Sequence, residues 1–176
     1  FFRFSRRAMQ SLPHTHSCFV CGESNPAGLK LRFETDGRIV RTHFHPQTQH
    51  IGFKGVVHGG IIATVLDEIM VWACAVQTRQ FAFCAEMNVR YLQPIAPGVE
   101  VIFAAELVTN RKNRIYESKG SARTIAGVTL AESTGKYIPI KSDQIPAMMD
   151  ELIGDRSWLK ANLGVNASEN DTTPRT

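Results

Sequence analysis

Hydrophobic and polar residues alternate strictly in the stretch LKLRFET, residues 29–35, with apolar side chains at every second position. A period of two is typical of a strand that buries one face. Asp36-Gly37 reads as a hairpin turn, after which RIVRTHFH, residues 38–45, continues as a second strand. This part of the chain therefore predicts a β-hairpin.

The pattern changes in residues 58–78, which form the one long helical candidate. Apolar side chains there cover nearly the whole circumference of a helix: Ile61, Ile62, Val65, Leu66, Ile69, Met70, Val71, Trp72, Ala73 and Val76. A helix that is apolar all round is a buried helix. We therefore expect this segment to lie inside the protein.

Strand-like segments follow the helix without another helix between them, at residues 83–94, 99–110, 114–125 and 128–140. Consecutive strands without helical crossovers favour an antiparallel sheet. Together with the first two strands they predict an α+β fold, in which a sheet of about six strands wraps around one long central helix. A last helix is predicted from Ser142-Asp143, with Pro146 in its first turn, through AMMDELI.

Length and composition indicate one globular domain. The chain has 176 residues, 20% of them charged and 43% hydrophobic, with a net charge of +4 and no dense basic face of the kind expected of a nucleic-acid binder. Its longest apolar run, from Ile61 to Val76, is broken by polar residues, so we predict no membrane span. Four cysteines, two of them in apolar segments, suggest reduced thiols and a cytoplasmic protein.

The two ends of the chain differ from the middle. The opening FFRFSRRAMQ has three arginines and no acid, so it could be the remnant of a targeting peptide. We interpret Met9 instead as the true start, and residues 1–8 as not native. The closing SENDTTPRT is small and polar, and we predict a disordered tail there.

The candidate chemistry lies in HGGIIATVLDE, residues 58–68. Gly59 and Gly60 at a helix start expose backbone N–H groups, and the helix dipole favours a developing negative charge there. Burying Asp67 is costly and needs a functional reason, whereas Glu68 could equally pair with an arginine or face solvent. Because Gly60 and Asp67 are separated by about 10 Å of helix rise, the sequence indicates a composite site between two copies of the helix.

The stretch GVVHGGIIATVLDE resembles the helix signature of the hotdog-fold thioesterases, in the branch of the PaaI-type acyl-CoA thioesterases. That family has His-Gly-Gly with a catalytic acid nine residues after the histidine, the spacing of His58 and Asp67 here. The flanking stretches CFVCGESNPAGLKLRF and AEMNVRYLQPIAPG also resemble this branch, so the likeness covers residues 18–140.

The resemblance implies a hotdog fold, dimers and often tetramers, and metal-free hydrolysis of an acyl-CoA thioester without a cofactor. By position, the Gly60 amide would polarise the thioester carbonyl, with Gly59 beside it. Asp67 of the partner chain would be the nucleophile or general base, and His58 would orient the loop and the substrate.

Two positions depart from the family pattern. Cys84 stands where many relatives have a Thr or Ser that holds water, and a thiol is a weaker hydrogen-bond partner. Gly52 stands where some relatives have an Asn. Another group, such as His50 or Gln49, could then position the water, although an exposed loop position for His50 is equally compatible with the sequence.

Binding of coenzyme A would require cationic side chains for its phosphates. The cluster NRKNR supplies Arg111 and Arg114, and Lys119 follows on the next strand, although a solvated hairpin turn explains the cluster equally well. Arg90 is a further phosphate candidate, and Asn88 could contact the pantetheine arm.

The stretch HTHSCFVCG could supply zinc ligands from His14, His16, Cys18 and Cys21. One CxxC in so flexible a segment is weak evidence for a metal, and we predict no metal site. The expected role of Cys18 is to pack the first segment onto the sheet together with Phe19.

The sequence thus predicts an N-terminal segment over residues 1–27, a hotdog thioesterase domain over 28–140, and a C-terminal helix and tail over 141–176. Its predicted function is acyl-CoA hydrolysis. A non-catalytic hotdog module that binds acyl-CoA as a regulator or scaffold is the alternative. A hydratase on the same fold is disfavoured, because the chain lacks a helix-start motif of the HFPG kind.

Overall fold

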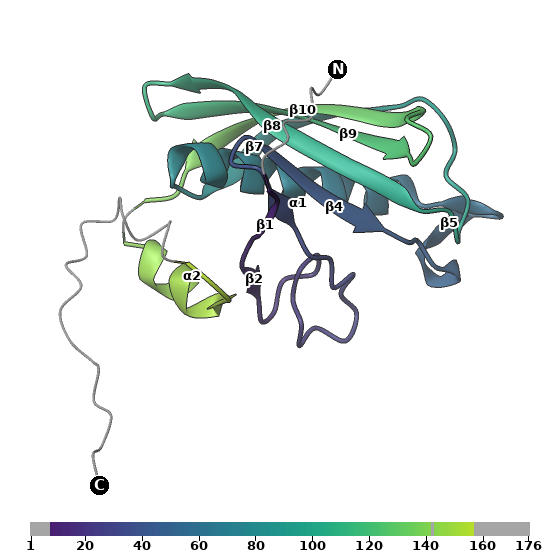
Figure 1. Ribbon diagram of the computed structural model, residues 1–176, viewed down its shortest axis with the longest axis horizontal. Helices are drawn as coiled ribbons and strands as arrows, with labels where there is room; N and C mark the ends of the chain where they lie inside the picture. The colour runs from purple at the N-terminus through teal and green to yellow at the C-terminus, as the bar shows by residue number, and fades with distance from the viewer. Residues whose placement is uncertain (1–7, 142, 157–176) are drawn as a thin grey trace, which may run out of the picture.

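The structure is a computed structural model that describes residues 8–141 and 143–156 (Figure 1). The interpretation of residues 1–7 and the predicted tail at 168–176 lie outside the described residues.

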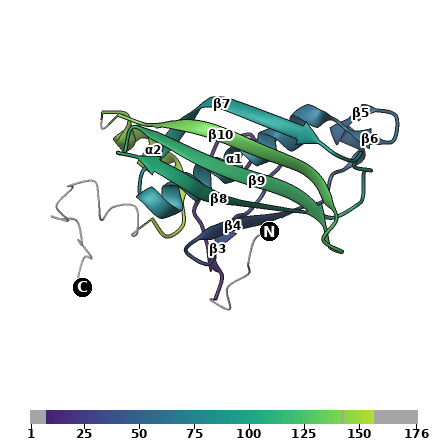
Figure 2. The ribbon, with the colours of Figure 1, turned by 90° about the horizontal axis from the view of Figure 1, so that it is seen from above.

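A seven-stranded antiparallel sheet forms the body of the molecule, in the spatial order β1-β3-β4-β8-β9-β10-β7. Its members are β1 (Gln10–Ser11), β3 (Glu34–Thr35), β4 (Ile39–Phe44), β8 (Val101–Arg111), β9 (Ile115–Thr124), β10 (Thr129–Pro139) and β7 (Ala82–Tyr91). Figure 2 shows the long strands side by side, with β7 along one edge. The predicted antiparallel sheet is therefore confirmed.

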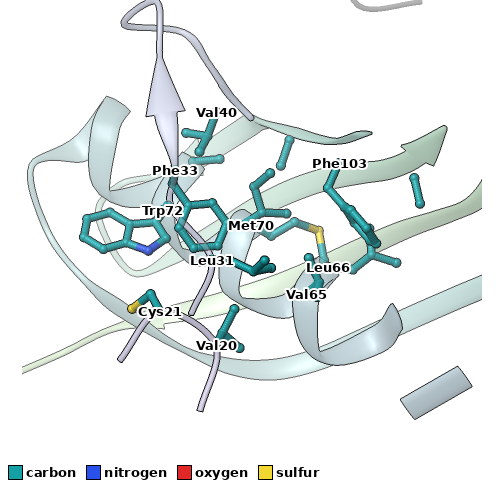
Figure 3. Close-up of a cluster of buried hydrophobic side chains, with 14 of the residues drawn as sticks. Val20, Cys21, Leu31, Phe33, Val40, Val65, Leu66, Met70, Trp72 and Phe103 are labelled. Carbon is teal, nitrogen blue, oxygen red and sulfur yellow. The ribbon is translucent and has the colours of Figure 1, made fainter. Parts of the chain in front are cut away.

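The helix α1 (Gly59–Thr78) packs along one face of this sheet, as Figures 1 and 2 show. Its side chains fill the core, and Figure 3 shows Val65, Leu66 and Met70 of α1 below Val40 of β4 and Phe103 of β8, in one apolar cluster. Because this α1 face and the inner sheet face are both apolar, burying one against the other removes both from water. The structure thus has the hotdog arrangement expected from the sequence.

Two small sheets complete the fold. β2 (His14–Thr15) pairs with β11 (Leu152–Ile153), and β5 (Ile51–Phe53) pairs with β6 (Val56–Val57) after a short 3-10 helix, η1 (Thr48–His50). The C-terminal helix α2 covers Ile145–Glu151, so it is shorter than predicted because the chain turns into β11 at Leu152. None of these short strands carries an alternation long enough to be read from sequence.

The first predicted strand is also shorter in the structure than in the prediction. Only Glu34–Thr35 of residues 29–35 is a strand, because Lys30 has a positive φ of 56° that interrupts extended backbone. Leu31 and Phe33 are nevertheless buried, as the alternation predicted. Their segment runs beside the N-terminal residues, where the Leu31 N–H donates to the Val20 carbonyl.

One side of α1 is only partly covered. Between the two ends of the helix, its incompletely buried positions recur at helical spacing and lie on one stripe: Gly60, Ile61, Ala63, Thr64, Asp67, Glu68 and Val71. By length and composition α1 could also cross a membrane, with a mean hydropathy of 1.7 over its most apolar window. Here it is the core helix of the sheet, and packing accounts for its apolar character.

Candidate active site

The start of α1 is organised by His58. This residue is the N-cap, with extended backbone (φ −60°, ψ 130°), and its Nδ1 accepts a hydrogen bond of 2.9 Å from the Gly60 N–H. An N-cap acceptor satisfies one of the amides that a helix start leaves without a partner. Because Nδ1 accepts, the proton of the neutral imidazole is on Nε2, which is therefore the donor.

The backbone around His58 is closely packed. The His58 N–H donates to the His50 carbonyl at 2.8 Å, and a Cβ atom on Gly52 would lie 2.6 Å from His58 Cδ2 and 2.8 Å from its Cα. Only glycine therefore fits at position 52 against this histidine. The structure brings His50 and Gly52 beside His58, where Gly52 leaves room for the ring.

The His50 side chain has a separate local role. Its Nδ1 accepts from the Gln47 N–H at 2.9 Å, and its ring lies 5.4 Å from the Phe44 ring, centroid to centroid. Burial lowers the pKa of His50 below its ordinary value, so the ring is favoured in the neutral form. These contacts fix the loop that packs against His58.

The amide of Gly59 is the donor at the start of α1 that has no acceptor among the described residues. As the first helical residue, Gly59 has no acceptor within the helix, and no hydrogen bond from its N–H is formed with any residue the structure describes. Its carbonyl accepts from the Tyr91 hydroxyl at 2.9 Å, which ties the helix start to β7. The Gly60 amide, by contrast, is already engaged by His58.

Asp67 lies two turns further along α1, in a small polar cluster. Its Oδ1 accepts a 3.1 Å hydrogen bond from the hydroxyl of Tyr137, a fully buried residue of β10. Cys84 of β7 is the cross-strand neighbour of Tyr137, and its thiol also interacts with Asp67. Cys84, which the sequence placed at a position where relatives hold the water, thus lies beside Asp67, whereas no motif points to Tyr137.

The two side chains beside Asp67, Cys84 and Tyr137, have raised pKa values. Burial, and then the nearby Asp67 carboxylate, raise the pKa of the Cys84 thiol to about 11. The same two causes raise the pKa of Tyr137 well above its ordinary value. At neutral pH both groups therefore keep their protons and can donate hydrogen bonds to the carboxylate.

Within one chain, the Gly59 amide at the helix start and the Asp67 carboxylate remain apart. Gly59 and Asp67 are eight residues apart on one straight helix, which corresponds to about 12 Å of rise. Asp67 lies on the incompletely covered stripe of α1, next to edge strand β7. The Gly59 amide and the Asp67 carboxylate of one chain are therefore too far apart to act on one small acyl group.

Edge strand β7 is long and exposed. Nearly all of its residues from Phe83 to Tyr91 are accessible, with Phe83 56% and Tyr91 55% exposed. The outer edge of a strand of this length, on the side away from its neighbour, presents backbone N–H and C=O groups that can pair with another strand. The edge is therefore suited to joining two sheets.

The residues that the sequence suggested for binding coenzyme A fall into two groups. Asn88, Arg90 and Lys119 line a cavity of about 310 Å³ together with Arg123. Asn88 and Arg90 lie on the outer face of the sheet, since their alternating neighbours Met87 and Val89 pack on the core. Lys119 is exposed between the buried residues Ser118 and Gly120, so it faces the same side.

The hairpin arginines lie elsewhere. Arg111 pairs with Glu117 at 2.6 Å across the β8–β9 hairpin, and Arg114 lies in the same turn. The structure thus brings together Asn88, Arg90 and Lys119, but places the hairpin pair outside that cavity.

The four residues considered as zinc ligands are not gathered around one point. His14 pairs with Glu23 at 2.9 Å, while Cys18 and Cys21 lie together beside Glu68 of α1. Hydrogen bonding from the Cys21 thiol lowers the pKa of Cys18 to about 5, and burial raises the pKa of Glu68 to about 7. Cys18 packs against the core as expected, but Phe19 is 41% exposed.

Comparison with known proteins supports an assignment at the level of the fold and superfamily. The family model described as "Thioesterase superfamily" matches residues 54–116. Mouse acyl-coenzyme A thioesterase 13 is 26% identical over 87 residues, which cover 49% of this chain and 62% of the mouse protein. The chain thus spans less than two thirds of that relative.

Solved structures agree with this assignment. The thioesterase superfamily protein RHA08564 superposes with a TM-score of 0.65 at 25% identity, over 70% of this chain and 60% of that one. The PaaI protein of E. coli, from the phenylacetic acid degradation operon, gives a TM-score of 0.58 at 18% identity, over 64% of this chain and 81% of that one.

A sheet packed around one long helix that begins with His-Gly-Gly defines a hotdog-fold protein. The matches to the thioesterase family model and to the mouse acyl-CoA thioesterase support the hotdog thioesterase family, and the fold is also similar to that of the PaaI protein.

Proposed function

We propose that the protein hydrolyses acyl-CoA thioesters to a free acid and coenzyme A, as a homodimer with two composite sites. The observation that carries this proposal is the arrangement of Asp67 on the open stripe of α1, held by Tyr137, while the same helix begins with a glycine amide that has no partner among residues 8–141 and 143–156. Similarity to acyl-CoA thioesterase 13 supports the choice of substrate class.

In this proposal the Gly59 N–H of one chain binds the thioester carbonyl oxygen. We assign this role to Gly59 in place of Gly60, because the Gly60 N–H already donates to His58. The amide and the helix dipole would stabilise the oxyanion of the tetrahedral intermediate. His58 would hold the helix start in place, with Gly52 giving it room.

In this proposal Asp67 of the other chain is the nucleophile or the general base. Tyr137 fixes Oδ1, which leaves Oδ2 to attack the thioester carbon or to remove a proton from an attacking water. When water attacks, the new C–O bond replaces the C–S bond, and the proton that Asp67 took from the water passes to the sulfur of coenzyme A, which leaves as a thiol. When Asp67 attacks, the C–S bond breaks to give an acyl-aspartyl anhydride and the thiolate of coenzyme A, and a water then hydrolyses the anhydride to the free acid and restores Asp67, while the proton released goes to the thiolate. Cys84 would contribute a weak donor near the water.

The outer-face cavity is our candidate for the coenzyme A phosphates. Asn88 and Arg90 lie on β7, and Lys119 extends the same cavity from β9. Because β7 is the proposed dimer edge, this cavity borders the interface, and a coenzyme A chain could pass over it. Arg111 and Arg114 stand outside this cavity and are weaker candidates.

The proposed function is tested by release of free thiol from a panel of acyl-CoAs that differ in chain length and aromatic character. Turnover of at least one thioester, with saturation by substrate, is the expected result. Tight binding of coenzyme A without any thiol release would overturn the hydrolase and favour the non-catalytic acyl-CoA-binding module.

The proposed dimer can be tested separately from the activity. The native chain should run at twice its mass of 19.6 kDa or at a multiple of that, measured by light scattering during size exclusion. Phe83→Asp should shift the protein towards monomer and reduce turnover in parallel, because it places a charge on the exposed β7 edge.

The matched control for this variant is Ile125→Asp, which changes another exposed apolar residue, 69% accessible, beyond the end of β9. It should leave the mass unchanged. A monomeric native protein with full turnover would rule out the composite site.

A further inference from the structure

We propose that Cys18, Cys21 and Glu68 form a binding site for one Zn²⁺ ion, which ties the N-terminal segment to the central helix. The two sulfurs and a Glu68 carboxylate oxygen all lie within 4.8 Å of one another. They come from two parts of the chain that are 47 residues or more apart in sequence. The site lies outside the proposed thioester chemistry, which uses the Asp67 side of α1.

The distances fit a tetrahedral zinc ion. With Zn–S of about 2.3 Å and Zn–O of about 2.0 Å, tetrahedral geometry separates a sulfur from an oxygen ligand by about 3.5 Å. The observed separation between Cys18 Sγ and Glu68 Oε1 is 3.7 Å. A zinc ion between these atoms therefore requires only a small adjustment of the side chains.

The turn that carries the two thiols is shaped to present them together. The Gly22 N–H donates to the Cys18 carbonyl at 2.9 Å, and the Val20 N–H donates to Cys18 Sγ at 3.2 Å. A Cβ on Gly22 would lie 2.3 Å from the Cys18 carbonyl oxygen, so the turn closes only with glycine. An N–H group directed at a sulfur stabilises the thiolate form that binds a metal.

Glu68 is held toward the thiols by a second contact. The Trp72 Nε1–H donates to Glu68 Oε1 at 3.2 Å, and Figure 3 shows Cys21 beside this tryptophan. No ion pair between Glu68 and a lysine, arginine or histidine occurs in residues 8–141 and 143–156. A partly buried carboxylate that faces two thiols lacks a compensating positive charge, and a divalent cation would supply it.

The donor set identifies the metal. Two thiolates favour a soft or borderline ion, and the carboxylate and tetrahedral separations favour Zn²⁺. The fourth position would face a largely apolar cavity of about 360 Å³, which Cys18 and Glu68 line together with residues of α2. Water can complete the coordination from that side.

A redox pair of Cys18 and Cys21 is the competing explanation, but it gives no role to Glu68. A disulfide needs only the two sulfurs, so it leaves the placement of the Glu68 carboxylate beside them without an explanation. The convergence of three ligand atoms is therefore better explained by metal binding.

The test is the zinc content of the reduced full-length protein after incubation with Zn²⁺ and removal of excess metal. We expect about one zinc per chain in the native protein, and near zero in Cys18→Ser and Cys21→Ser. Glu68→Gln should weaken binding by at least about 10-fold, because even indirect partners of a metal have effects of that size. Cys84→Ser is the matched control and should keep its zinc.

Substitution of Co²⁺ for zinc keeps the test independent of variant folding. The native protein should show thiolate-to-cobalt charge-transfer absorption, and a chelator should lower its melting temperature by releasing the N-terminal segment. Absence of this absorption, native protein without zinc, or equal zinc in the two serine variants and the control would each overturn the proposal. A Cys18–Cys21 disulfide that forms readily in protein without metal affinity would also overturn it.

Discussion

Asp67→Asn should reduce thioester hydrolysis by about 10²–10⁴-fold, the range that a positioned acid or base contributes. Asparagine has nearly the same shape, and its amide oxygen can still accept the hydrogen bond from Tyr137. It can neither attack the thioester as a carboxylate nor take a proton from water. The measurement is thiol release under saturating acyl-CoA, with the fold checked by circular dichroism and the dimer by light scattering.

Asp150→Asn is the control for this variant, because it makes the same chemical change at an exposed position of α2. Its turnover should equal that of the native protein. Binding of coenzyme A to the Asp67 variant should persist, since the carboxylate is assigned to chemistry and not to the nucleotide. Equal rates in the Asp67 variant and the native protein would remove this residue from the mechanism.

The second large effect is expected from Gly59→Pro, which removes the proposed oxyanion donor. Proline is tolerated at the first helical position, and the extended backbone of His58 (φ −60°, ψ 130°) is compatible with a following proline. The helix should therefore form while the N–H is lost. Loss of one oxyanion donor typically lowers kcat by about 10²–10³-fold, which we expect here.

The variant Gly59→Ala distinguishes the effect of losing the N–H group from the effect of adding a side chain. An added Cβ would lie 3.2 Å from Tyr91 Cζ, so both variants require the same small movement of that side chain. Alanine keeps the N–H, and its turnover should stay near the native value. If alanine and proline reduce kcat equally, the steric change is responsible and the Gly59 amide has no catalytic role.

Mixing the two inactive variants tests whether the site is shared between chains. When Asp67→Asn and Gly59→Pro subunits exchange at random, half of the dimers are mixed, and each mixed dimer has one site with both groups intact. About a quarter of native activity should then return, as expected for a two-fold symmetric dimer. No recovery despite confirmed subunit exchange would show that both residues act within one chain.

The fold could be predicted from local patterns because each pattern has a direct physical cause. A helix that is apolar on nearly all sides must be covered, and consecutive alternating strands without crossovers can cover it only as an antiparallel sheet. The predicted extent of α1 agrees with the structure to within one residue. The first strand was overestimated, because Lys30 has a positive φ and the N–H groups on either side of it, of Leu29 and Leu31, donate to the carbonyls of Phe19 and Val20.

The candidate site was only partly predictable. His58, the glycines and Asp67 are close in sequence and share a spacing, so a motif could identify them. Tyr137 is 70 residues from Asp67, and only the pairing of β10 with β7 brings it there beside Cys84. The contact between Gly52 and His58 likewise appears only when β5 packs against the helix start.

The sequence by itself determined the class of fold, the central helix and the family signature at its start, because these depend on periodicity and on short-range spacing. Only the tertiary structure decided which glycine amide is free, what holds Asp67, and that Glu68 faces the thiols of Cys18 and Cys21. The contacts of Asp67 with Tyr137, and of Glu68 with the two thiols, join residues far apart in the chain. Their distances are set by how the sheet and its flanking segments pack around α1, and no local pattern records that packing.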